Sequence, residues 1–251
     1  MQKLFVNIFG LIFFVASQLL AQQFSSGSPE WLVDMFFSKS SFPEKANYFS
    51  GEMLDESDKP TIGEELNGKG EISFHQIKAG DDKIVFAVEL KLNEKVVDFY
   101  AYLKKQNNDW KITAVRSFVL PDFVYKVADS LSNQTYLADS SLYLSLKLFT
   151  INDSQLKNYF IDKSDSFNEL ISYFNQNDKE SGDKKLSELG CTAIFRDTGF
   201  PGCTFVLINS FKKIGAGFIY VSESAKLPEI SEKDFIYIEE ILPGWFIFRT
   251  I

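Results

Sequence analysis

Four strand-like runs between residues 71 and 118 constrain the fold of this chain more than any other feature. They are Glu71–Lys78, Lys83–Leu92, Lys95–Lys105 and Trp110–Phe118, joined by AGDD, Asn93-Glu94 and QNND, which are good turn formers. With Asn93-Glu94 as a two-residue turn, the facing pairs are Leu90/Val97, Val88/Phe99, Phe86/Ala101 and Ile84/Leu103. All of these side chains are apolar, and a slip of one residue would mix the faces. The sequence therefore predicts an antiparallel sheet with one buried face.

The same register, extended through the outer turns, assigns the remaining residues to faces. The buried face would also carry Ser73, His75, Ile77, Ile112, Ala114, Arg116 and Phe118. The opposite face would carry Glu89, Asp98, Tyr100, Tyr102 and Lys111 and be partly solvated. His75, the only histidine, could then share no site with Asp98. Glu89 and Asp98 would face each other, either as two solvated acids or as a carboxylate pair with a raised pKa.

Two expected helices precede this sheet, one opening at Ser28-Pro29-Glu30 and one over 43–49, and its last strand contains Trp110-Lys111-Ile112. This arrangement over residues 28–120 resembles the nuclear-transport-factor-2-like (NTF2-like) superfamily. The resemblance implies a curved sheet wrapped around helices, with pockets on its concave face. Members include isomerases, dehydratases and many non-catalytic binding domains, so the fold alone does not determine the function.

Arg116 is the residue that points most directly to a ligand. A buried arginine is costly unless it is paired. On the buried face it would either meet a carboxylate such as Asp34 or face a cavity that holds an anion. With His75 and Ser73 nearby, the second alternative predicts a site for a small anionic or polar ligand. In an enzyme of this type, His75 would be the candidate catalytic base.

The remainder of the chain has helical spacing first and strands afterwards. Residues 121–151 are expected to form a helical linker, and residues 152–251 a second domain with an antiparallel sheet. The predicted fold class is therefore α+β throughout. Near the end of the chain, Arg249 is expected to face Ile238, diagonal to Glu240. It would form a cross-strand ion pair with Glu240 that contributes little to stability.

Residues 1–21 have the pattern of a secretory signal peptide: Lys3, an apolar run, and Ala21 before the expected cleavage. Cleavage after Ser17 is the alternative. The product is expected to be exported, periplasmic or secreted, without stable membrane insertion.

Cys191 and Cys203 flank RDTGFPG, which contains turn formers. A hairpin centred on Asp197 would place the two cysteines opposite each other. An oxidising compartment would then favour a disulfide, and two reduced buried thiols are the alternative. A redox-active pair is usually closer in sequence.

Composition narrows the function classes. The net charge of −8 argues against nucleic acid as a partner. One His and two Cys leave little material for a metal site, and the phosphate-cradle and nucleophile motifs are absent, so no metal and no cofactor is expected. We expect an exported, non-enzymatic protein that binds a small ligand or an envelope protein; an NTF2-like enzyme using His75 and Arg116 is the alternative.

Overall fold

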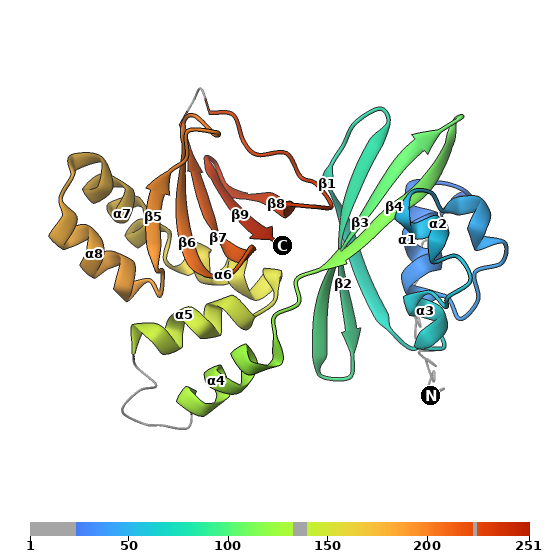
Figure 1. Ribbon diagram of the computed structural model, residues 1–251, viewed down its shortest axis with the longest axis horizontal. Coiled ribbons are helices and arrows are strands. Elements are labelled where there is room, and N and C mark those ends of the chain that lie inside the picture. The colour runs from blue at the N-terminus through green and yellow to red at the C-terminus, as the bar shows by residue number, and fades with distance from the viewer. Residues whose placement is uncertain (1–23, 133–139, 223–224) are drawn as a thin grey trace, which may run out of the picture.

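The computed structural model describes residues 24–132, 140–222 and 225–251, and the predicted signal peptide lies outside them. The chain forms two halves, each with its own antiparallel sheet, which lie side by side (Figure 1). The fold class is α+β, as predicted. Within the described ranges, no helix is long and apolar enough to cross a membrane.

The first half consists of short helices and a four-stranded sheet in the order β1-β2-β3-β4. Its elements are α1 (Pro29–Ser38), the 3₁₀ helix η1 (Lys45–Tyr48), α2 (Glu52–Asp55), α3 (Ile62–Glu65), β1 (Glu71–Lys78), β2 (Lys83–Leu92), β3 (Lys95–Gln106) and β4 (Asp109–Ser117). Ser28 caps α1 by accepting a hydrogen bond from the backbone of Trp31. The fully buried Leu32 and Phe37 of α1 pack on one face of this sheet.

The central hairpin has the predicted register. Each of the four expected pairs between β2 and β3 is present. Six of these eight side chains contribute to the cluster that contacts α1, with Phe86 and Leu103 almost completely buried. The pair at the turn, Leu90 and Val97, lies outside that cluster, and Val97 is exposed. The two-residue turn at Asn93-Glu94 therefore fixes this part of the sheet.

The faces predicted for the outer strands are wrong. In β1, His75 pairs with Ala87 and Ser73 with Glu89, one residue away from the predicted alignment. In β4, an irregularity beside Leu103 leaves Ile112 on the helix-covered face but pairs Arg116 with Tyr100. Because a shift of one residue exchanges the faces of a strand, Ser73, His75 and Arg116 lie on the face away from α1.

The second half places its helices before a five-stranded sheet in the order β5-β6-β7-β9-β8. The helices are α4 (Asp122–Ser132), α5 (Ser141–Thr150), α6 (Asp153–Asp162), α7 (Ser164–Gln176) and α8 (Lys179–Glu188). The strands are β5 (Ala193–Arg196), β6 (Cys203–Phe211), β7 (Ile214–Val221), β8 (Phe235–Leu242) and β9 (Trp245–Thr250). Of the residues expected to form a helical linker, 133–139 lie outside the described ranges, and α4 and α5 flank them. Helix α5 packs on this sheet, where the Ser145 hydroxyl donates to the carbonyl of Ile208 at 2.9 Å.

The predicted disulfide is absent, and both cysteines are free and buried. Arg196 pairs with Thr204, so the β5–β6 hairpin is centred near Phe200, three residues beyond the predicted centre. The loop is longer because Asp197 folds it locally, with its carboxylate accepting from the backbone of Gly199 at 2.7 Å. Cys191 and Cys203 consequently belong to separate clusters of buried side chains. Burial raises the pKa of both thiols.

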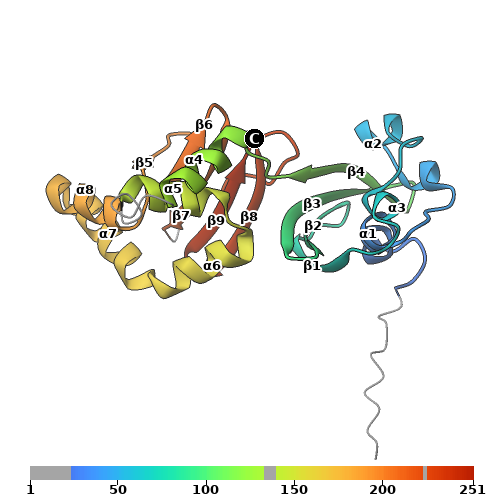
Figure 2. The same cartoon turned by 90° about the horizontal axis from the view of Figure 1, so that it is seen from below.

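Most of the face predicted to be partly solvated is instead the interface between the halves (Figure 2), whereas Lys111 donates to the carbonyl of Asn47 within the first half. Tyr100 is fully buried and stacks on Tyr237 of β8, with ring centroids 4.9 Å apart. The hydroxyl of Tyr102 donates to the carbonyl of Ile236 at 2.7 Å. Tyrosines suit this position because their rings are buried while their hydroxyls find partners.

Candidate functional site

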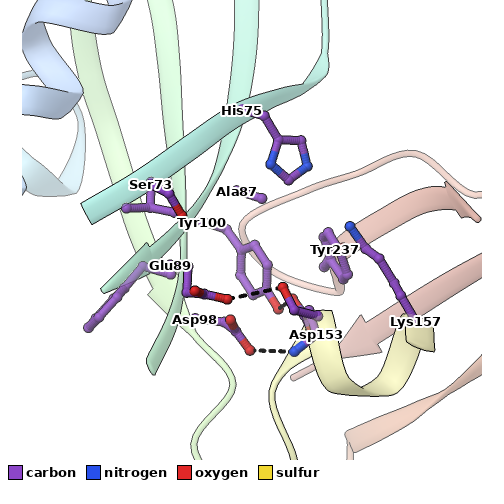
Figure 3. A pocket seen from close by; sticks show the side chains of 12 residues that line it. Ser73, His75, Ala87, Glu89, Asp98, Tyr100, Asp153, Lys157 and Tyr237 are labelled. Atoms are coloured by element: carbon purple, nitrogen blue, oxygen red, sulfur yellow. Dashed lines mark hydrogen bonds between the residues drawn. The ribbon is translucent and has the colours of Figure 1, made fainter. Parts of the chain in front are cut away.

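A small polar pocket lies where the two halves meet, and we call it the junction pocket (Figure 3). Its volume is about 120 Å³. The first half contributes Ser73 and His75 from β1, Ala87, Val88 and Glu89 from β2, and Asp98, Phe99 and Tyr100 from β3; the second contributes Asp153, Ser154 and Lys157 from α6 and Tyr237 from β8. Neither half forms this pocket alone.

A buried ion pair supports the pocket from the second half. Arg249 on β9 is 1% exposed, and its Nε lies 3.0 Å from Oδ1 of Asp153. Its guanidinium also donates to the carbonyl of Ile151 at 2.9 Å and lies 4.4 Å from the ring centroid of Phe118. The hydroxyl of Tyr100 donates to the other oxygen of Asp153 at 2.6 Å, which ties the first half to the pair.

The cross-strand ion pair predicted between Arg249 and Glu240 is therefore wrong. Irregularities in β8 pair Arg249 with Tyr237, so that it does not face Ile238. Its carboxylate partner comes from α6, ninety-six residues earlier in the chain, and not from Glu240. A buried pair of this kind requires good geometry and further hydrogen bonds to offset desolvation.

Asp98 is the most perturbed acid of the pocket. Its Oδ2 accepts a hydrogen bond from the backbone N–H of Asp153 at 2.8 Å, at the start of α6. Burial, followed by the neighbouring carboxylate of Asp153, raises the pKa of Asp98 to about 7. Asp98 is therefore a group that can take up or release a proton near neutral pH. The interpretation of Glu89 and Asp98 as two solvated acids is wrong for Asp98.

Glu239, which does not line the pocket but contacts three residues that do, behaves in the opposite way. Burial alone would raise its pKa, but hydrogen bonds from His75, Lys157 and Tyr237 lower it to about 2. The oxygen–nitrogen distances are 2.9 Å to Nε2 of His75 and 2.8 Å to Nζ of Lys157. Glu239 thus stays ionised and joins β1 to β8.

The structure separates the predicted site residues. Ser73 and His75 line the junction pocket and share it with Asp98, contrary to the prediction that His75 and Asp98 lie on opposite faces. Arg116 does not line it. Both of its terminal nitrogens contact the carboxylate of Glu52, one at 2.8 Å, and its Nε donates to the carbonyl of Glu232. Arg116 therefore has a carboxylate partner, but this is Glu52 and not Asp34, and the Glu52 side chain is 49% exposed, so the pair is not the internal one predicted.

Sequence reasoning missed the residues from the second half, namely Asp153, Lys157, Tyr237, Glu239 and Arg249. One signal existed: Asn152-Asp153-Ser154 begins α6, where Asn152 forms a capping box with Gln155. A helix start presents unpaired backbone N–H groups, and one of them binds Asp98. Nothing local in the sequence indicates which acid that helix start would meet.

Among the described residues, no group of three or more His, Cys, Asp or Glu side chains is arranged to hold a metal ion. Comparison of the chain with protein-family models, with curated proteins and with solved structures gives no match.

Proposed function

We propose that this chain is an exported, non-catalytic protein that binds a small polar ligand in the junction pocket. The observation that carries the proposal is a polar hollow walled by both halves, in which Ser73 and His75 from one half face Lys157 from the other. At about 30 Å³ per water molecule, its volume of about 120 Å³ would hold roughly four waters or one small molecule. Binding sites between domains are common because both sides can contribute polar groups.

The test is native mass spectrometry of the chain from Gln22, purified gently after export. A retained ligand should appear as a mass difference that disappears on denaturation. Ala87→Leu would fill the pocket and should abolish retention. Ala193→Leu is the matched control, since Ala193 is a half-buried strand residue that does not line the pocket. Equal ligand retention by the wild type and both variants would place the ligand outside the junction pocket. A wild type that retains no ligand would favour an envelope protein as the partner.

A second candidate is an enzyme that uses the same pocket. It is favoured by one observation: Asp98, with its pKa raised to about 7, shares the pocket with His75. Such an acid is suited to general acid–base catalysis, and the resemblance to NTF2-like proteins implies that some relatives use His and Asp in this way. Incubation of the identified ligand with the protein separates the two functions. An unchanged ligand supports binding alone, whereas conversion that Asp98→Asn abolishes supports the enzyme.

A further inference from the structure

A second hollow lies in the second half, between α7, α8 and β5, at the end of the molecule away from the first half (Figure 1). It has a volume of about 410 Å³ and shares no residue with the junction pocket. Leu170, Tyr173, Phe174 and Ile194 form its apolar wall. Small-molecule sites typically have volumes of about 300–1,000 Å³ and are lined mainly by apolar and aromatic side chains with a few polar groups.

Gly182 keeps this hollow open. It lies within α8, where glycine is less favourable than alanine. Packing does not require glycine here, because an added Cβ would lie 3.8 Å from Cβ of Tyr173, an ordinary contact distance. Its φ is not positive either. The consequence of having glycine at this position is therefore space inside the hollow.

Among the residues that line the hollow, acidic side chains outnumber basic ones, and the guanidinium of Arg196 lies beside them over Phe174. Asp178 and Asp183 line the hollow, against the single cation of Lys179. Asp178 is engaged in capping α8: its Oδ1 accepts from the backbone of Ser181 at 3.2 Å, and hydrogen bonds from Ser181 lower its pKa. Asp183 is exposed, next to Gly182, and its side chain has no hydrogen bond or ion pair with any described residue. Its carboxylate is available to a positively charged group.

One face of Phe174 is already covered by a cation of the protein, which leaves Tyr173 and the rest of Phe174 to a ligand. The guanidinium of Arg196 already lies 5.2 Å from the ring centroid of Phe174, which is a cation–π distance. We propose that this hollow binds a small aromatic amine, with its ring against Tyr173 and Phe174 and its ammonium group at Asp183. The site is independent of the ligand proposed for the junction pocket.

The probe is 2-phenylethylammonium, titrated into the protein that begins at Gln22 and contains both halves. Binding is measured by isothermal titration calorimetry. Binding should be at least tenfold tighter than that of 3-phenylpropionate, which has the opposite charge, and of butylammonium, which lacks the ring. Gly182→Leu fills the hollow and should weaken binding at least tenfold. Ser187→Leu, on the exposed side of the same helix, is its control.

Asp183→Asn should weaken binding about fivefold, and Glu180→Gln, a neighbouring exposed acid outside the hollow, should not. Gly182→Met, which has a long side chain and a high helix propensity, serves as a second filling variant if Gly182→Leu does not fold. Equal binding of the charge-inverted probe, full binding by a folded Gly182→Leu or Gly182→Met variant, or no binding by the wild type would each overturn the proposal.

Discussion

Replacement of Asp98 by asparagine should stabilise the protein at alkaline pH. The change keeps the side-chain oxygen that accepts from the backbone of Asp153, but removes a carboxyl whose charged form is disfavoured by burial and by the neighbouring Asp153 carboxylate. The pKa of Asp98 is raised from 3.8 in the unfolded reference to about 7 in the fold. The folded protein therefore holds more protons on Asp98 than the unfolded chain does between about pH 4 and 7.

The sign of the effect follows from this difference in proton binding. Where the folded state binds more protons, the free energy of unfolding falls as pH rises. The contribution of Asp98 to the free energy of unfolding therefore falls progressively from about pH 4 to the folded pKa of about 7. Above that pH it does not change further. At about 1.4 kcal/mol per pH unit, the full loss above pH 7 is at most about 4 kcal/mol.

Urea unfolding of both proteins at pH 5, 6, 7 and 8 measures this effect. The difference between variant and wild type isolates Asp98, because the other titrations are common to both proteins. The free energy of unfolding of Asp98→Asn should rise relative to that of the wild type as pH rises. At pH 8 the variant should be the more stable protein. Glu89→Gln is the matched control: Glu89 contributes least to the raised pKa of Asp98, so most of the wild-type pH dependence should remain. A difference between Asp98→Asn and wild type that is flat from pH 5 to 8 would refute the reasoning.

Two further substitutions and one labelling experiment have expected outcomes. Arg249→Met should cost about 3–5 kcal/mol in urea unfolding, because it leaves the Asp153 carboxylate buried without its cation, and a loss below 1 kcal/mol would contradict that role. Glu239→Gln should lower the free energy of unfolding by about 1–2 kcal/mol at pH 7 after solvent screening. Near pH 2 the loss should be much smaller, since the pKa of Glu239 is lowered from 4.5 to about 2. An unchanged dependence of stability on pH would argue against its three hydrogen bonds. Cys191 and Cys203 should both react with iodoacetamide after unfolding without reductant, whereas a mass lower by two hydrogens would reveal a disulfide.

The central hairpin could be predicted from the sequence because a two-residue turn leaves one register that keeps the apolar residues together. The outer strands could not, because their alignments depend on local irregularities. Between β3 and β4 the register shifts beside Leu103, and between β1 and β2 it shifts near Gln76. Each shift moves side chains to the other face, and this separated His75 from Asp98 in the prediction.

The cysteine and Arg249 predictions were wrong for a related reason. Both predictions pair the residues of two strands symmetrically about an assumed centre of the connecting turn. This pairing is right only if the loop has the assumed length and the strands have no irregularities. The β5–β6 loop is longer, because Asp197 forms its own turn within it, and β8 has irregularities that change the partner of Arg249. Residue types indicate where a hairpin lies more reliably than they indicate which residues face each other.

The sequence pattern of the junction residues also fits a solvated face. Tyr100 and Tyr102 alternate with inward-facing apolar residues on β3, which fits either an exposed amphipathic face or an interface whose hydroxyls find buried partners. Asp98 lies on the same face, and its pKa differs between these two alternatives. On a solvated face it is an ordinary acid, whereas against the start of α6 its pKa is raised to about 7. The docking of the two halves therefore creates the titratable group of the pocket, and a first half expressed without its partner should lack it.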